Sequence, residues 1–372
     1  MGFKGMGKAN SQHCSLSIIL IPSLQTFQEG LLSTRRLVFT DEQVYFECLG
    51  LYCSEMFDIP LQVWKKMHHG RQPFLHHRYR AAPHFRILGV FPLDGCGVHP
   101  CDIYSRINEY SKRSLTHSAD ILNGMLGIFR AFEQGRNSVC HLYGLPFHTE
   151  DSRTLPTFSE SLRWTLEAPS ERREGFPSWS WTGWYGEIKW PHEFTDPTSS
   201  GENQNPPEYL RDPKVDEREI RVAVELREGS IINWETFRTR YDEIRTFNKP
   251  SGIIRLEANT TPAVYLNNEG TSKVQIGLRG EDGRCITLLA ELTTKHHFKP
   301  QDPLLAIHIC QRASGKQGND NSIVRSGGAV AVRQYVLIVR DVGKHWERVA
   351  SGVHVLDPRI SLERRRRWLR FG

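Results

Sequence analysis

The feature that most constrains the fold is a tryptophan-rich run, FPSWSWTGWYGEIKW, which spans residues 176–190. It holds four of the nine tryptophans in the 372-residue chain. An indole ring combines a large apolar surface with one N–H group, which needs a hydrogen-bond acceptor when the ring is buried. So many rings in one short run must therefore either fill a core or line a ligand-binding surface.

The spacing of these tryptophans favours a core. Trp179 and Trp181 are two residues apart, so in a strand they would point to the same face. Trp184 follows Gly183, where we expect a bend. A platform that stacks bases or sugars normally carries cationic groups beside its rings, and only Lys189 is close in sequence. We expect these three tryptophans to pack at a seam between two parts of the protein, and a stacking platform is the alternative.

The composition is that of a folded chain, with 38% hydrophobic and 24% charged residues. A chain of 372 residues can bury more than one core, which predicts two parts. The longest apolar run, residues 15–24, is much shorter than the roughly 20 residues that cross a bilayer, and no small-x-small cleavage site follows it. We expect neither a membrane span nor a secretion signal, and a cytoplasmic location.

Metal and nucleotide motifs are weak or missing. Cys96, His99 and Cys101 lie close together in CGVHPC. Cys48 and Cys53 are further potential ligands, but the spacing matches no standard zinc site. The run HHGRQPFLHH contains no carboxylate or cysteine and is interpreted as an exposed loop. The eight irregularly spaced cysteines favour reduced thiols. The common phosphate-loop, dinucleotide and nucleophile-elbow motifs are absent, so we expect no metal and no cofactor.

The net charge of +6 comes in good part from ERRRRWLR, residues 363–370. A run of like charges is usually a solvated segment, and a basic end differs from a basic groove. We therefore interpret this run as a solvated end and expect no nucleic-acid contact. Nucleic-acid binding by residues 364–367 is the alternative, and it would weaken as salt is added.

Hydrophobic periodicity predicts secondary structure along the chain. In the first half it predicts a hairpin over residues 36–48 with TDEQ as its turn, helices over residues 103–110 and 121–132, and a short helix over residues 158–166. Thr116 or Ser118 is the expected N-cap of the second of these helices. In the second half it predicts strands over residues 219–226, 252–257, 263–266, 274–278, 285–290, 304–310, 329–340 and 348–355.

These elements predict an α+β protein with a helical and loop-rich N-terminal part and a β-rich, mainly antiparallel C-terminal region. The first part includes residues 51–195, which hold the tryptophan run. Residues 196–213 are rich in Pro, Ser, Asn and Gly and are predicted to be a linker or long loop. The β-rich region then covers residues 214–372.

Four segments of the chain, in the same order, resemble fungal heterokaryon-incompatibility (HET) domain proteins. TFQEGLLSTRRLVFTDEQVYFEC, residues 26–48, is similar to the closing segment of the HET domain. YSKRSLTHSADILNGMLGIFRAF, residues 110–132, resembles the helix pair that follows this domain, and the tryptophan run resembles the Trp-rich signature further on. The ending RRRRWLRFG is similar to the way many of these chains end.

The resemblance implies an N-terminally truncated member of the family. Residues 1–50 would hold a remnant of the end of a HET-like domain, whose α/β front half is missing. Residues 1–24 fit no family segment, and Gln25 stands where the family usually has a tryptophan. Such a protein would act in non-self recognition, in which the fusion of incompatible hyphae triggers programmed cell death, through protein partners.

The resemblance also implies one candidate catalytic residue. HET domains are distantly similar to TIR domains, some of which cleave NAD with a glutamate. Glu29 in TFQE is the matching carboxylate in this chain. Because the segments that would complete a nucleotide pocket are missing, we expect a non-catalytic signalling protein. An NAD-consuming enzyme that uses Glu29 is the alternative.

Overall fold

The computed structural model describes residues 24–39, 44–48, 51–55, 95–97, 99–115, 117–135, 138–149, 157–191, 220–295, 298–299, 302–313, 332–356 and 361–372. The expected linker over residues 196–213 and the histidine run lie outside the described residues, as does the proposed cap Thr116. Within the described part the chain is α+β, with a mainly antiparallel C-terminal sheet, as the sequence predicts. None of the described helices has the length and apolar character that a bilayer crossing requires.

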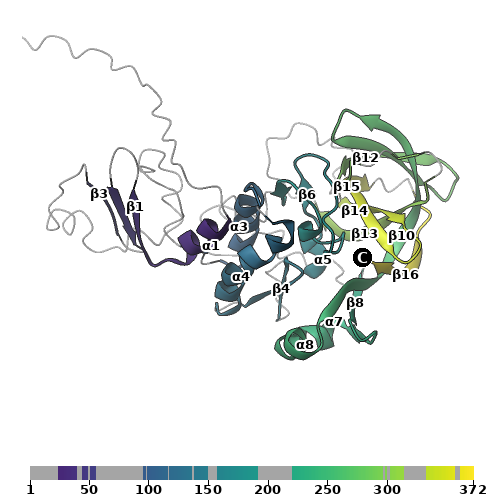
Figure 1. Ribbon diagram of the computed structural model, residues 1–372. Helices are drawn as coiled ribbons and strands as arrows, with labels where there is room; N and C mark the ends of the chain where they lie inside the picture. The colour runs from purple at the N-terminus through teal and green to yellow at the C-terminus, as the bar shows by residue number, and fades with distance from the viewer. Residues whose placement is uncertain are drawn as a thin grey trace, which may run out of the picture.

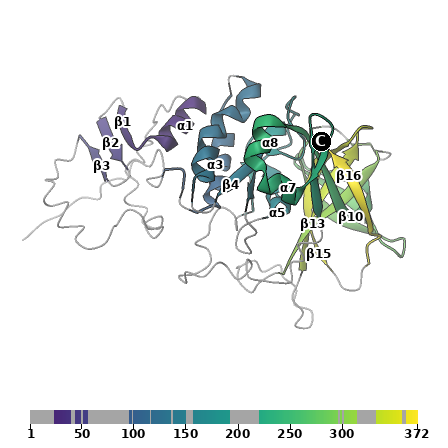
Figure 2. The ribbon, with the colours of Figure 1, turned by 90° about the horizontal axis from the view of Figure 1, so that it is seen from below.

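The N-terminal elements are α1 (Leu24–Leu32) and a three-stranded sheet of β1 (Arg35–Phe39), β2 (Val44–Cys48) and β3 (Leu51–Ser54). The predicted hairpin is confirmed, because β1 pairs antiparallel with β2 from Arg35 opposite Cys48 to Phe39 opposite Val44. Figure 1 and Figure 2 show this small sheet beyond α1, on the side away from the large sheet. The strand β1 is an edge of the small sheet.

A helical layer follows α1 and its sheet. Its elements are α3 (Asp102–Ser111), η3 (Ser118–Ile121), η4 (Asn123–Met125), α4 (Leu126–Glu133), β4 (Val139–Leu142), β5 (Leu145–His148), α5 (Phe158–Ser161), β6 (Thr165–Leu166), η5 (Trp181–Gly183) and β7 (Ile188–Lys189). The helix α3 confirms the first predicted helix. Its apolar face is fully buried and packs in this layer.

The second predicted helix is only partly correct. The chain forms two 3₁₀ turns before α4 begins at Leu126, and Ser118 lies inside the first turn and makes no capping hydrogen bond. The side chain of Tyr110 explains the irregular start, because its hydroxyl donates to the Ile121 carbonyl over 2.8 Å. The Met125 N–H bonds instead to the Leu122 carbonyl, three residues before it, as in a 3₁₀ turn.

The helix predicted over residues 158–166 is also shorter than expected. It begins with a capping box between Thr157 and Glu160, and it ends at Ser161. The carbonyls of Leu162 and Trp164 accept hydrogen bonds from Arg348 instead of from the next helical turn. A partner distant in sequence therefore ends this helix.

The C-terminal region is a nine-stranded sheet with two short helices. Its elements are β8 (Arg221–Leu226), β9 (Ile231–Asn233), α7 (Trp234–Thr239), α8 (Tyr241–Phe247), β10 (Pro250–Glu269), β11 (Lys273–Arg279), β12 (Cys285–Leu292), β13 (Leu304–Ala313), β14 (Val332–Asp341), β15 (Trp346–Leu356) and β16 (Arg365–Phe371). All its strand pairs are antiparallel except β15 with β16.

The sheet closes on itself through β10. The two strands predicted over residues 252–257 and 263–266 are one strand of 20 residues. Its first half pairs with β8 and β16, its middle with β13, and its last part with β11. The pairings then run from β11 through β12, β15, β14 and β13 back to β10, which makes a closed ring of six strands. Partners on both sides keep β10 extended where the sequence shows no apolar alternation.

Two buried clusters use opposite faces of this ring. Along β13, Leu304 and Ala306 point to one cluster and Leu305 and Ile307 to the other, as alternation in a strand requires. The inner core consists of Ala263, Val274, Ile276, Leu278, Leu288, Ala290, Leu292, Phe298, Leu304, Ala306, Val336, Ile338, Val349, Ala350 and Leu362. The seam core joins the helical layer to outward-facing residues of the sheet, among them Ile254, Leu256, Leu305, Ile307, Leu337, Val339, Leu369 and Phe371.

The seam core places the helical layer between the two sheets. Figure 1 and Figure 2 both show α3, α4 and α5 between the small sheet of β1 to β3 and the closed ring. The same buried cluster continues from Phe27 in α1 to Phe371 in β16. The tryptophan run belongs to this layer.

Candidate functional site

The tryptophan run does not form the strand that its spacing suggested. Trp179 lies in a turn, and the 3₁₀ turn η5 begins at Trp181. The Ser180 side chain caps η5 by accepting from the Thr182 N–H, and its hydroxyl also bonds to the Tyr143 carbonyl over 2.5 Å. The rings therefore leave a tight turn in different directions and do not line one face.

All the tryptophans of the run are buried, with exposed fractions of 0% to 5%. Each indole N–H donates to a main-chain carbonyl. The pairs are Trp179 with Gly252 at 3.0 Å, Trp181 with Gly144 at 2.7 Å, Trp184 with Ser178 at 2.8 Å and Trp190 with Ser161 at 3.1 Å, and Trp164 just before the run bonds to Trp179 at 3.0 Å. These indoles therefore have no N–H group left to donate to a ligand.

Trp179 connects the helical layer directly to the sheet. Its N–H reaches Gly252, which lies in β10 with φ +95, a conformation that glycine adopts without strain. Its ring packs edge-on against Tyr143 and Phe158, with centroid distances of 6.0 and 6.1 Å. The Tyr143 hydroxyl donates to the Pro250 carbonyl at 2.9 Å, which adds a second link to the same strand.

Arg348 crosses the seam from the opposite side. It lies in β15, is fully buried, and stacks on the Trp164 ring with 3.7 Å between its central carbon and the ring centroid. Its guanidinium donates to the carbonyls of Leu162 and Trp164 and to the Ser351 hydroxyl. Burial lowers the pKa of Arg348 to about 9.

The last residue of the chain is part of the seam. The Gly372 carbonyl accepts hydrogen bonds from both the main-chain N–H and the hydroxyl of Ser178. The Ser178 hydroxyl oxygen in turn accepts from the Arg348 N–H at 3.0 Å. The tryptophan run, β15 and the chain end therefore meet at one serine.

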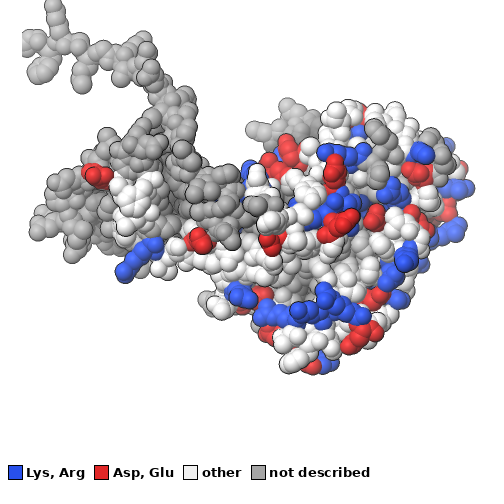
Figure 3. All heavy atoms as spheres, in the orientation of Figure 1, with Lys and Arg blue, Asp and Glu red and all other residues white. Residues whose placement is uncertain are grey.

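The basic end is the strand β16 and not a free tail, but Arg364, Arg365 and Arg366 are exposed, as expected for a solvated run. Arg366 pairs with Glu257 at 3.3 Å, and Arg370 pairs with Glu225 at 2.6 Å. The Arg367 side chain donates to the Thr260 hydroxyl. On the face drawn in Figure 3, acidic side chains lie among the basic ones over the C-terminal part. Pairing with β10 recruits this segment into the sheet, and local charge gives no indication of that.

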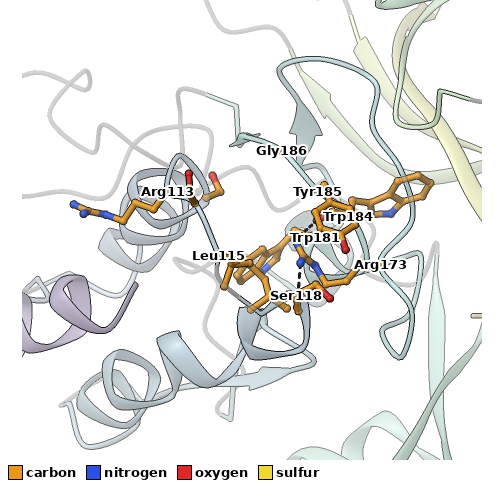
Figure 4. A pocket seen from close by; sticks show the side chains of 11 residues that line it. Arg113, Leu115, Ser118, Arg173, Trp181, Trp184, Tyr185 and Gly186 are labelled. Atoms are coloured by element: carbon orange, nitrogen blue, oxygen red, sulfur yellow. Dashed lines mark hydrogen bonds between the residues drawn. The ribbon is translucent and has the colours of Figure 1, made fainter. Parts of the chain in front are cut away.

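A pocket of ≈ 190 Å³ lies beside the tryptophan run (Figure 4). Its wall combines the indoles of Trp181 and Trp184 with residues of the α3–η3 connection, such as Leu115 and Ser118. Arg113 also lines it, but its side chain extends away from the pocket in Figure 4, and its guanidinium lies 4.5 Å from the Phe27 ring centroid. No aspartate or glutamate is among the lining residues.

Arg173 is the charged group at this pocket. It is 3% exposed and donates to the carbonyls of Thr182, Ser118 and Trp184 at 3.1, 3.0 and 3.2 Å. Its central carbon lies 4.0 Å from the Tyr185 ring centroid. Burial lowers the pKa of Arg173, while its phenolic neighbours Tyr185 and Tyr110 act in the opposite direction. Sequence analysis did not find this residue, because SERREG looks like an ordinary charged loop.

The remaining sequence candidates lie elsewhere. Glu29 is on the exposed side of α1 and does not line the pocket. The His99 ring nitrogen accepts from the Cys101 N–H at 3.2 Å. Within the described residues no group of three potential ligands is arranged to hold a metal ion. The side chains of Cys48 and Cys53 lie outside the described set.

Comparisons of the chain with models of known protein families, with curated proteins and with solved structures found no match.

Proposed function

We propose that this chain is a non-catalytic signalling protein of the HET type, which acts in the cytoplasm in fungal non-self recognition and programmed cell death. The family assignment is supported by the four similar segments, from TFQE in α1 to the basic strand β16. In this proposal the tryptophan segment is a structural element, because its indoles are all bonded to main-chain carbonyls.

The observation that carries the proposal is the exposed apolar edge at β1. Leu37 and Phe39 are 63% and 74% exposed on β1, which among the described strands pairs only with β2. Such an edge usually pairs with another strand or is covered, because free N–H and C=O groups beside apolar side chains invite association.

The proposed contact is strand addition at β1 by a HET-type partner protein. Main-chain hydrogen bonds along the edge would supply affinity, and Leu37 and Phe39 would supply apolar contacts. The adjacent α1 is anchored by Phe27 and Leu31, which are buried in the seam core, so the edge is attached to a fixed support.

The contact is tested by expressing the chain in a filamentous fungus and scoring the viability of cells after hyphal fusion with a strain that lacks it. We expect reduced viability of fused cells, and recovery when Phe39 is replaced by Lys. Phe247→Lys is the matched control, since Phe247 is 78% exposed but lies on α8. Equal viability with and without the chain, or equal recovery in both variants, would contradict the proposal.

The NAD-consuming alternative is tested separately. Purified chain is incubated with NAD, and nicotinamide release is compared for the parent, Glu29→Gln and Glu281→Gln. Glu281 is an exposed glutamate in the turn between β11 and β12 and serves as the control. We expect no turnover in any sample. Turnover that is lost only in Glu29→Gln would establish the enzyme instead.

A further inference from the structure

The charge of Arg173 has no acidic partner in the described structure. Its hydrogen-bond acceptors are three neutral carbonyls, and no salt bridge involves it. An arginine side chain has five N–H donors, so two of them have no acceptor among the described residues. A buried cation that lacks a counter-ion is costly, and binding an anion would offset that cost.

The surroundings of Arg173 also favour a negatively charged ligand. The pocket that it lines contains the serines Ser111, Ser114 and Ser118 and no carboxylate. The Ser111 hydroxyl is already used, since it donates to Asn108 and accepts from Ile188, whereas Ser114 and Ser118 are exposed at the rim. Hydroxyl and guanidinium donors together are the groups that bind carboxylate and phosphate oxygens.

The size and walls of the pocket define the rest of the ligand. A volume of ≈ 190 Å³ is enough for a small ligand but not for a nucleotide-sized one. Trp181, Trp184 and Leu115 supply apolar wall on one side of it (Figure 4). The space therefore fits a small planar or aliphatic body that carries one charged head.

We propose that this pocket binds a small organic oxyanion, with a carboxylate or phosphate head on Arg173 and an apolar body against Trp181 and Leu115. The site lies beside the tryptophan run and away from β1. It does not depend on the proposed HET-type function. The guanidinium is held in place by its three carbonyl bonds and by the Tyr185 ring, so it is already oriented before a ligand arrives.

The test measures binding of benzoate, phenyl phosphate and inorganic phosphate to the full chain by isothermal titration calorimetry, with benzamide as the neutral analogue. We expect benzoate or phenyl phosphate to bind and benzamide not to bind. If inorganic phosphate binds and the two aromatic anions do not, the ligand makes no apolar contact with Trp181 and Leu115, and the proposal is overturned. Equal binding of benzamide, or binding of none of these compounds, would overturn it as well.

Ser118→Asp is the decisive variant, because it introduces a carboxylate at the pocket-lining residue whose main-chain carbonyl accepts from the Arg173 guanidinium. We expect anion affinity to fall by at least about tenfold, since a bound internal carboxylate competes for the same charge. Ser118→Asn has nearly the shape of Ser118→Asp without its charge and is the matched control, so it should bind the anion more tightly than Ser118→Asp does. Ser118 is exposed, so both variants should fold, which circular dichroism checks.

Arg173→Gln provides a second readout that does not depend on Ser118. It removes the charge and keeps a side-chain donor, and we expect it to abolish anion binding. If it unfolds the chain, the comparison of Ser118→Asp with Ser118→Asn decides the matter alone. Unchanged affinity in Ser118→Asp would show that the anion does not use Arg173, and would overturn the site.

Discussion

The seam core and the inner core are both closed to water, but they are built in different ways. In the seam core, the indoles of the tryptophan run and the buried guanidiniums of Arg173 and Arg348 each donate to a particular main-chain carbonyl. The inner core is a set of aliphatic side chains and one phenylalanine on alternating strand positions. Directed hydrogen bonds make the seam depend on residue identity, whereas the ring interior depends on volume and pattern.

The largest expected effect is that of removing a seam ring. Trp181→Ala should lower the free energy of unfolding by about 3 to 5 kcal/mol, because it removes a buried indole and leaves a cavity. Trp368→Ala is the matched control, since Trp368 is 52% exposed and should cost less than about 0.5 kcal/mol. Urea unfolding followed by circular dichroism measures both. Similar losses of unfolding free energy in the two variants would show that a tryptophan of the seam contributes no more to stability than an exposed one.

Replacing the indole by a smaller aromatic ring without a donor sharpens the comparison. Trp181→Phe leaves the buried Gly144 carbonyl without the indole N–H that lies 2.7 Å from it. We expect a loss of about 1 to 3 kcal/mol, the usual cost of an unsatisfied buried polar group. The same urea titration measures it. A variant as stable as the parent would mean that the seam, like the ring interior, depends on volume alone.

Acid should weaken both regions through buried histidines. Burial lowers the pKa of His141, in the helical layer, and of His308, in the closed ring of six strands, to about 3. The usual pKa of a histidine is 6.5. Between pH 3 and pH 6.5 the unfolded chain binds protons at these histidines that the folded chain does not. The contribution of the neutral histidines to stability is therefore full above pH 6.5 and is lost as the pH falls. The expected loss is about 1.4 kcal/mol per pH unit for each histidine.

Unfolding free energies at pH 6.5 and 5.5 measure this dependence. His308→Gln should remove about 1 kcal/mol of the difference between the two pH values, because the unfolded histidine is already half protonated at pH 6.5, and His141→Gln should remove a similar amount. The partner of His308 is the Thr261 hydroxyl at 2.9 Å, and Gln can still reach a hydroxyl. A difference that is the same in the parent and both variants would show that other groups control the acid response.

The smallest expected effect is in the inner core. Ile276→Val removes one methylene from a fully buried position of β11 and should cost about 0.5 to 1.5 kcal/mol. Thermal unfolding measures it against the parent. A loss as large as that of Trp181→Ala would mean that the ring interior is as demanding as the seam, and the contrast between the two cores would be lost.

Sequence pattern predicted much of the local structure. The hairpin of β1 and β2, the helix α3 and most strands of the ring were predicted, because short-range apolar periodicity determines them. It could not predict that two predicted strands are the single strand β10, or that the basic end is β16. Both depend on partners that lie 100 or so residues away, roughly the separation of Thr260 from Arg365.

The candidate site was predicted less well. The tryptophans were expected to be structural, yet their arrangement on one strand face was wrong, because a capped 3₁₀ turn replaces the strand. Arg173 and Arg348 were not singled out at all. An arginine among other charged residues is normally solvated, and only a list of its spatial neighbours shows that it is buried.

The sequence by itself determined that this chain folds as α+β and that a cluster of indoles must be accommodated, because apolar periodicity and ring size act locally. The tertiary structure alone decided which carbonyls accept the indole and guanidinium hydrogens, that the ring of six strands closes through β10, and that one arginine faces a pocket without a counter-ion. Those features arise from pairings between segments that are distant in sequence. The composition of the two segments does not predict which of their groups share a hydrogen bond across the seam.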